Sequence, residues 1–125
     1  MIYLDTHIVV WLYAGLVDKL SPLGQSLINQ QVLFISPIVR LELKYLYEIK
    51  RIRALPETII ADLQSRLGLV VCNREFNDVV TQAMTIEWTR DPFDRLITAQ
   101  SMLEDKILLT KDRTILANHP QARWD

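Results

Sequence analysis

The stretch Ile107–Arg113, ILLTKDR, changes abruptly from three bulky apolar residues to Thr110, Lys111 and Asp112. A short and wholly apolar run predicts a β-strand that is buried on both faces, as in a parallel sheet covered by helices. The residues that follow such a strand lie at the carboxyl edge of the sheet. We therefore expect Asp112 at that edge.

The beginning of the chain repeats this arrangement. Ile2–Leu4 is a short apolar run that ends in Asp5 and Thr6, and an amphipathic segment, His7–Ala14, follows. If both runs are strands of one parallel sheet, Asp5 and Asp112 share an edge where open α/β sheets bind their ligands. Two carboxylates about 5 Å apart repel each other by roughly 3 kcal/mol at an effective dielectric constant near 20. We therefore expect a positive charge between them.

The composition indicates one domain, residues 1–125, because half of the residues are hydrophobic (50%) and can bury a sizeable core. Lys and Arg (14) nearly balance Asp and Glu (15), so the total charge does not indicate nucleic-acid binding, although a local basic patch is compatible with it. The single cysteine, Cys72, excludes an internal disulfide and a zinc site built from several thiolates.

The sequence also predicts a soluble, cytoplasmic protein. No apolar run approaches the roughly 20 residues that a membrane span needs. Met1 leads directly into the first predicted strand, where a signal peptide would otherwise stand.

Strands and helices are expected to alternate along the chain. Gly15 and Gly68 are plausible helix ends. The other expected strands are Leu33–Ile35, Leu69–Cys72 and a final edge strand at Ala122–Trp124, and the expected helices span residues 7–14, 22–30, 37–51, 59–67, 76–86, 96–103 and 113–116. This alternation, without repeats or a linker, predicts a single-domain α/β/α sandwich with a mainly parallel central sheet.

The helix predicted at residues 37–51 carries one acid of interest. Its apolar stripe is formed by Ile38, Leu41, Tyr45 and Ile49, and Glu42 falls on the edge of that stripe. Glu42 lies in the second turn, too deep to be an N-cap. Its carboxylate either reaches solvent or has a partner that compensates for its desolvation.

Four carboxylates occupy informative positions: Asp5, Glu42, Asp94 and Asp112, with Asp91 as a neighbour. Hard oxygen ligands without a cluster of His or Cys suit Mg²⁺ or Mn²⁺. One or two such ions would neutralise phosphate charge, lower the pKa of a bound water and align its attack. The chemistry that this set of ligands favours is metal-assisted hydrolysis of a phosphodiester.

Each acid also has a structural explanation. Asp5, Asp94 and Asp112 all stand where a helix begins, and Asp is a favoured N-cap. Glu42 can lie on a solvated helix edge, paired with a nearby basic residue. When the four acids are considered together, a shared site is favoured, because chance would otherwise have to place every acid near one edge of the sheet.

Other polar residues allow two interpretations each. The hydroxyls of Thr6 and Thr110 can orient a carboxylate or a bound water, or can serve a turn or cap. His7 is either a general base or a surface group. Arg90 and Arg95 either bind phosphates or pair with the neighbouring acids Asp91 and Asp94.

The chain has one basic cluster in sequence, in which Tyr45 and Tyr47 are interleaved. It is either a solvated helix face or an RNA-binding surface. Its members are Arg40, Lys44, Lys50, Arg51 and Arg53.

Four segments together resemble the PIN-domain ribonucleases, specifically VapC-type toxins of toxin–antitoxin pairs. They are LDTH at Leu4–His7, SPIVRLEL around Glu42, RDPFDRLITAQ at Arg90–Gln100 and LLTKD at Leu108–Asp112. The resemblance covers nearly the whole chain. It implies a PIN-like fold and a Mg²⁺- or Mn²⁺-dependent endoribonuclease, commonly a homodimer, that a cognate VapB-type antitoxin inhibits.

The resemblance also implies which residues form the site. Asp5, Glu42, Asp94 and Asp112 match the acidic site of the family, and Asp91 matches an acid whose role as a ligand is less secure. Thr89 departs from the pattern, because many relatives carry His there. The resemblance gives no role to the basic cluster.

Two other functions fit parts of the sequence. A receiver-like phosphoacceptor domain shares the length and the α/β alternation, but it needs paired acids after the first strand and an acceptor Asp after the third. Here Thr6 follows Asp5, and the third predicted strand ends in Cys72 and Asn73. A non-catalytic binding protein with the PIN fold is disfavoured because all four acids are present.

Overall fold

A five-stranded sheet forms the centre of the computed structural model, which describes residues 1–125. The strand order is β3-β2-β1-β4-β5, and every neighbouring pair is parallel. The predicted strands are confirmed, including the edge strand at the end of the chain. Their bounds are β1 Ile2–Leu4, β2 Leu33–Ile35, β3 Val70–Val71, β4 Ile107–Leu109 and β5 Ala122–Arg123.

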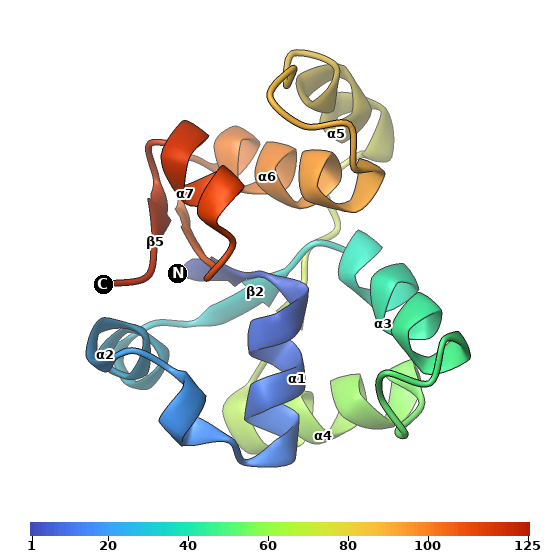
Figure 1. Cartoon of the computed structure of the whole chain (residues 1–125), viewed down its shortest axis with the longest axis vertical. Helices are drawn as coiled ribbons and strands as arrows, with labels where there is room; N and C mark the ends of the chain where they lie inside the picture. The colour runs from blue at the N-terminus through green and yellow to red at the C-terminus, as the bar shows by residue number, and fades with distance from the viewer.

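Seven helices and one short 3₁₀ helix pack around this sheet. Figure 1 shows α6 and α7 above the strands and α1, α2 and α4 below them, while α3 contacts both α4 and α6. The predicted α/β/α sandwich is therefore confirmed. The helices are α1 Thr6–Ala14, η1 Val17–Lys19, α2 Pro22–Gln30, α3 Ile38–Glu48, α4 Pro56–Leu67, α5 Phe76–Ala83, α6 Pro92–Glu104 and α7 Arg113–Asn118.

Local chemistry sets several helix boundaries. The two predicted glycine stops are found, since Gly15 (φ 72°) and Gly68 (φ 68°) follow α1 and α4 in the left-handed conformation that glycine adopts without strain. The Ser21 hydroxyl caps α2 by accepting a hydrogen bond from the Gly24 amide. None of these helices has the length and apolar character that a membrane crossing requires.

The central strands are buried on both faces. Ile2, Tyr3, Leu4, Leu108 and Leu109 are each at most 1% exposed. Truncating a Leu in such a position to Ala typically costs about 2–5 kcal/mol, so these strands form a rigid frame. The residues that follow β1 and β4 are held by this frame at the carboxyl edge of the sheet.

The predicted apolar stripe of α3 is wrong except at Ile38, which is half-buried and packs against the core. Val39 and Leu43 are fully buried, whereas Leu41 (57%), Tyr45 (49%) and Ile49 (43%) are exposed. Both sets have helical spacing, and the packing of α3 against α4 and α6 selects the row that contains Val39 and Leu43. The opposite row is left as an exposed apolar face.

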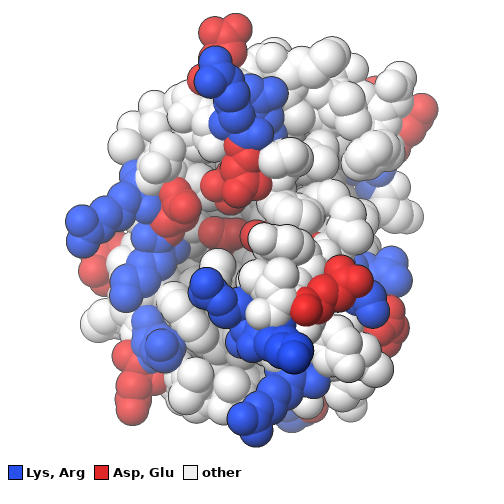
Figure 2. Space-filling view, turned by 45° about the vertical axis from the view of Figure 1, so that its right-hand side comes forward, with Lys and Arg blue, Asp and Glu red and all other residues white.

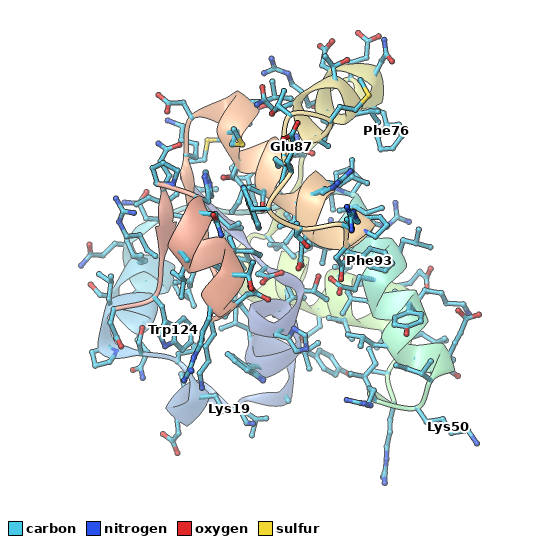
Figure 3. All side chains as sticks on the ribbon, turned by 45° about the horizontal axis from the view of Figure 1, so that its top comes forward. Lys19, Lys50, Phe76, Glu87, Phe93 and Trp124 are labelled. Carbon is cyan, nitrogen blue, oxygen red and sulfur yellow. The ribbon has the colours of Figure 1, made fainter.

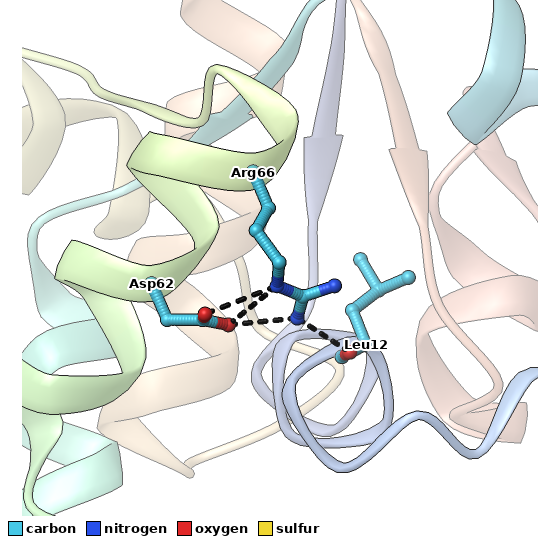
Figure 4. A network of polar contacts seen from close by, with 3 residues as sticks. All are labelled: Leu12, Asp62 and Arg66. Carbon is cyan, nitrogen blue, oxygen red and sulfur yellow. Dashed lines mark hydrogen bonds and ion pairs between the residues drawn. The ribbon is translucent and has the colours of Figure 1, made fainter.

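Two ion pairs are present, and both lie away from the acids identified in the sequence. Arg66 binds the Asp62 carboxylate through Nε and Nη2, and Nη2 also donates to the Leu12 carbonyl (Figure 4). Arg74 pairs with Glu104 at 3.1 Å. Arg66 thereby ties α4 to the end of α1, at a modest gain because such exposed pairs are worth at most about 1 kcal/mol.

Candidate active site

A cavity opens at the carboxyl ends of β1 and β4. The chain continues from β1 to β2 on one side of the sheet and from β4 to β5 on the other, so these two strands form the switch point where open parallel sheets bind ligands. The cavity has a volume of about 400 Å³ and is called the acidic cavity below. It is lined by Asp5, His7, Ile8, Trp11, Glu42, Asp91, Asp94, Lys111 and Asp112.

All five acids singled out in the sequence therefore line one cavity, although they come from distant segments. Asp5 and Asp112 follow strands, Glu42 lies on α3, and Asp91 and Asp94 stand at the start of α6. Figure 2 shows acidic side chains gathered at a hollow in the surface, with Lys and Arg side chains around it.

Asp5 is the most buried of these acids, at 7% exposed. Its carboxylate accepts hydrogen bonds from the Thr6 amide at 2.8 Å and from the Thr110 hydroxyl at 2.6 Å. Burial raises the pKa of Asp5, and the bonds from Thr110 and Thr6 act in the opposite direction. Since the two threonines are fully buried, they fix the orientation of this carboxylate.

Thr6 also connects Asp5 to Glu42. Its hydroxyl donates a hydrogen bond to the Glu42 carboxylate. Burial is the main reason that the pKa of Glu42 is raised, the bond from Thr6 lowers it, and the charge of Asp5 raises it further. Glu42 is thus turned into the cavity and has a hydroxyl as its partner, which excludes the interpretation of a solvated edge paired with a basic residue.

Thr110 connects Asp5 to Asp112 in a similar way. The Thr110 hydroxyl donates to Asp5 and accepts a hydrogen bond from the Asp112 amide at 3.0 Å. The Asp112 carboxylate caps α7 by accepting from the Ile115 amide at 2.9 Å. The capping interpretation of Asp112 therefore holds, and this acid lines the cavity as well.

Asp91 and Asp94 differ in what they contact. Asp91, and not Asp94, is the N-cap of α6, because its carboxylate accepts hydrogen bonds from the amides of Phe93 (2.8 Å) and Asp94 (3.3 Å). The Asp91 amide in turn donates to the Thr89 hydroxyl at 3.2 Å. Thr89 thus helps to shape the turn that precedes α6.

Asp94 also lies in an environment that disfavours its charged form. Burial raises its pKa to about 7, with further increases from the negative charges of Asp91, Asp5, Asp112 and Glu42. Two factors thus favour the neutral form, loss of solvent and the proximity of like charges. A carboxyl group with a pKa near neutrality in a cavity is a mark of a functional site.

The residues fit a divalent cation in chemical type. Every acid that lines the cavity offers carboxylate oxygens, the donors that Mg²⁺ and Mn²⁺ prefer. Burial is the main reason that the pKa values of Asp5, Glu42 and Asp94 are raised, and neighbouring negative charges, which such an ion would neutralise, raise them further. No three of the acids already stand at metal-ligating spacing. Hydroxyl and cap contacts hold several of them at separate positions around the cavity.

Two lining residues were missed in the sequence: Trp11 and Lys111. Lys111 is the positive residue at the cavity, but its ammonium contacts indole rings and forms no ion pair with the acids. His7, considered as a general base, lines the cavity with its ring 6.4 Å from that of Trp11. Trp11 follows Asp5 by nearly two helical turns, a spacing that alone does not predict a functional role.

Of the two interpretations of Arg90 and Arg95, pairing with the neighbouring acids is not found in the structure. Neither arginine forms an ion pair, and Arg95 Nε donates instead to the Thr89 carbonyl at 2.8 Å. His119 is buried and shares a hydrogen bond of 2.7 Å with Ser101. It lies outside the acidic cavity.

Solved structures of other proteins are similar to this chain along its length. One is a chain from the crystal structure of VapBC2 from Rickettsia felis bound to a DNA fragment from their promoter, with 21% identity, a TM-score of 0.67 and 100% of each chain covered. Another is a chain from a toxin–antitoxin complex from Klebsiella pneumoniae, with 19% identity, a TM-score of 0.71, and 98% of this chain and 96% of that chain covered. At these identities the likeness shows a shared fold.

A search of curated proteins found no match to this sequence. The family model described as the PIN domain matches residues 2–119, which is nearly the whole chain, and it confirms the resemblance of the sequence to PIN domains. The match includes every acid that lines the cavity. The chain belongs to the PIN domain family.

Proposed function

We propose that the protein is a metal-dependent endoribonuclease that acts as the toxin of a toxin–antitoxin pair. The observation that carries this proposal is the convergence of five carboxylates from separate segments on one cavity at the switch point of the sheet. Membership of the PIN family supports nuclease chemistry, and the two similar structures described above support the toxin assignment.

In this proposal Asp5, Glu42, Asp94 and Asp112 hold Mg²⁺ or Mn²⁺, with Asp91 as a further acid beside them. The ion, when bound, neutralises phosphate charge and lowers the pKa of a water molecule. The protein contributes the orientation of the ligands. Because Thr6 contacts both Asp5 and Glu42, it keeps two carboxylates turned toward the same space.

Thr110 has the corresponding role on the other side of Asp5. It contacts the Asp5 carboxylate and the Asp112 amide, so it sets the spacing between the acids that follow β1 and β4. Asp94 keeps a proton up to about pH 7 in the protein alone. Binding of a cation at this carboxylate therefore releases a proton, and the affinity for the ion is expected to rise between about pH 6 and pH 8.

The decisive experiment measures cleavage of RNA by the purified chain with Mg²⁺, with Mn²⁺ and with a chelator. We expect cleavage with the ions, none with the chelator, and loss of cleavage in Asp5→Asn and Asp94→Asn. Asp62→Asn is the matched control, since Asp62 is an acid on α4 whose partner is Arg66. Cleavage that survives both substitutions in the cavity would rule out the proposed site.

Binding without catalysis is the main alternative. It is tested by titrating Mn²⁺ against the wild-type protein and following thermal unfolding. An ion that leaves the unfolding temperature unchanged, together with the absence of cleavage, would favour a non-catalytic binding protein. An ion that stabilises the wild type but not Asp94→Asn supports the metal site even before an RNA target is known.

We also propose a cognate VapB-type antitoxin as a partner, since both similar structures come from toxin–antitoxin complexes. Expression of the chain alone is expected to arrest growth in the cytoplasm of a bacterial host, and Asp5→Asn is expected to relieve the arrest. Arrest by the Asp5→Asn variant would separate toxicity from the acidic cavity.

A homodimer is proposed from the exposed apolar face of α3. Leu41, Tyr45 and Ile49 expose about half of their surface, and the Tyr45 ring lies 6.1 Å from that of Phe93. Burying such a face against a second copy is favourable, at roughly 25 cal/mol per Å² of apolar surface. Sedimentation is expected to show a dimer for the wild type and a monomer for Leu41→Glu. Equal masses for the two proteins would contradict this interface.

A further inference from the structure

Two lysines and two tryptophans meet beside the acidic cavity, and this group is called the lysine–tryptophan rim below. The Lys111 ammonium lies 5.9 Å from the ring centroids of both Trp11 and Trp124. Lys19 lies 5.6 Å from the Trp11 centroid, and the two indoles meet edge to face at 6.0 Å. The four residues come from α1, η1, the loop after β4 and the end of the chain.

The rim keeps its positive charges free of acidic partners. Lys111 lines a cavity with five carboxylates, yet the ion pairs of the chain are Arg66–Asp62 and Arg74–Glu104. Attraction between the ammonium and the two indole rings biases Lys111 toward the rings. Neither Lys19 nor Lys111 is therefore neutralised by the acids, and both remain available to an anion.

This arrangement answers a physical difficulty of the proposed function. The acidic cavity repels the phosphates of an approaching nucleic acid, and the net charge of the protein, −1, does not attract them. Affinity must come from local cations that contact phosphates next to the one that enters the cavity. Lys111 is placed for this task because it follows Thr110 and lines the cavity itself.

We propose that the lysine–tryptophan rim binds the phosphodiester backbone of single-stranded RNA beside the bond that is cleaved in the acidic cavity. That the bound strand leads into the acidic cavity rests on the proposed nuclease function. The affinity for the strand rests on the rim itself. The indoles additionally offer an aromatic surface for an unpaired base, a contact that is tolerant of sequence.

The shape of the site favours an unpaired strand over a duplex. Asp5 is only 7% exposed, so a phosphate has to enter the recess to approach it. A duplex is stiff over many base pairs and cannot direct one phosphate into such a recess, whereas a flexible single strand can. The rim and the cavity share Trp11 and Lys111, so one strand can contact both at once.

A second lysine on an aromatic ring provides a matched control. Lys44 lies 5.3 Å from the Tyr47 centroid on α3, in the basic cluster considered in the sequence, and it does not line the cavity. In Figure 3, Lys50, also of that cluster, lies at the lower right, whereas Lys19 and Trp124 lie on the left. Substituting Lys44 removes the same charge and the same type of interaction at a different place.

The test measures binding of a labelled single-stranded RNA oligonucleotide in the presence of a chelator, so that cleavage does not occur. The dissociation constant is determined over a series of salt concentrations for the wild type, Lys19→Gln/Lys111→Gln and Lys44→Gln. Each phosphate of a single strand that a lysine neutralises adds about 0.7 to the steepness of log K against log salt, so the double variant is expected to be less steep by about 1.4. Lys44→Gln is expected to keep the wild-type slope.

A second measurement tests the aromatic part of the rim. Trp11→Leu is expected to weaken binding on the order of tenfold, and Trp11→Phe to restore most of it. If Trp11→Leu does not fold, as judged by its circular dichroism, the lysine variants still decide the question because both lysines are exposed. In steady-state cleavage the double lysine variant is expected to raise KM more than it lowers kcat.

The outcomes separate the rim from the nuclease proposal. Three results would each overturn the rim. The first is an unchanged salt slope in the double variant, and the second is a salt slope that decreases as much in Lys44→Gln as in the double variant. The third is equal affinity of the wild type for the single-stranded oligonucleotide and for its duplex. Wild-type protein that binds RNA through the rim but never cleaves it would overturn the nuclease proposal alone. RNA cleavage by the Lys19→Gln/Lys111→Gln variant that equals cleavage by the wild type would overturn the rim alone.

Discussion

Asp94→Asn is expected to make the ion-free protein more stable while it removes activity. The carboxyl group has a pKa of about 7 in the folded protein, against an ordinary value of 3.8. A pKa difference of about 3 corresponds to roughly 4 kcal/mol. Asp94 is only partly buried, so we halve this value for solvent screening and expect a gain of about 2 kcal/mol at pH 8.

The sign of the effect depends on pH. Since the pKa of Asp94 is higher in the folded than in the unfolded protein, the folded state binds the proton more tightly and stability falls as pH rises from about 4 to about 7. Below about pH 4 the carboxyl group is protonated in both states and Asn should confer little advantage. The gain from Asn should therefore grow with pH and level off above about pH 7.

The assay is urea denaturation of both proteins at several pH values in the presence of a chelator. A gain of about 2 kcal/mol would raise the urea midpoint by roughly 1–2 M. Asp62→Asn is the control of opposite sign, because the hydrogen bond from Arg66 lowers the pKa of Asp62, so that variant is not expected to gain stability at high pH. Equal stability of Asp94→Asn and wild type at pH 8, or a gain that does not vary with pH, would refute the reasoning.

Three further outcomes test other parts of the structure. Mn²⁺ at about 100 times its Kd should stabilise the wild type against thermal unfolding by about 2.7 kcal/mol, and an equal effect on Asp5→Asn would exclude Asp5 as a ligand. Thr110→Val removes the buried hydrogen bond of 2.6 Å to Asp5, so it should lower the free energy of unfolding in urea by about 1.5–3 kcal/mol. It should also weaken Mn²⁺ binding about 10- to 100-fold, and unchanged Mn²⁺ affinity would argue against a positioning role for Thr110. Burial lowers the pKa of His119, so stability should fall as pH drops below about 6.5, and His119→Gln should flatten the urea midpoint over that range; an equally steep dependence in the variant would place its origin elsewhere.

The parts of the fold that were predictable are those that local chemistry dictates. Gly15 and Gly68 end helices because their backbone conformation favours glycine, and the run Ile107–Leu109 is a strand because it is apolar on both faces. The convergence of Asp5 and Asp112 followed from the geometry of parallel strands. It needed no knowledge of side-chain packing.

The wrong predictions concern residues whose burial depends on the packing of another element against them. On α3, Val39 and Leu43 compete with Leu41 and Tyr45 as the buried row, and only the docking of α4 and α6 selects between them. The position of Trp11 at the cavity was not predictable for the same reason. Its contact with Trp124 joins two residues more than a hundred positions apart.

Arg95 illustrates a further limit. Its proximity to Asp91 and Asp94 in sequence allowed an ion pair as one of two interpretations, but its Nε donates to the Thr89 carbonyl, where it stabilises the turn before α6. A basic side chain that is close to an acid in sequence can instead donate its hydrogen bond to a backbone carbonyl. Such choices depend on distances of a few ångströms that sequence spacing does not resolve.

Asp5 and Asp112 each cap a helix and also line the cavity, and this limits which substitutions can be tolerated at the two positions. A copy of this protein that no longer needs its chemistry still needs those two helices to start where they do. Asn and Ser accept the same backbone hydrogen bonds without supplying a charge, whereas Ala leaves the helix start unsatisfied at a cost of about 0.5–2 kcal/mol. Relatives that lack the proposed cleavage activity are therefore expected to carry Asn or Ser at these positions, and relatives that have it are expected to carry Asp.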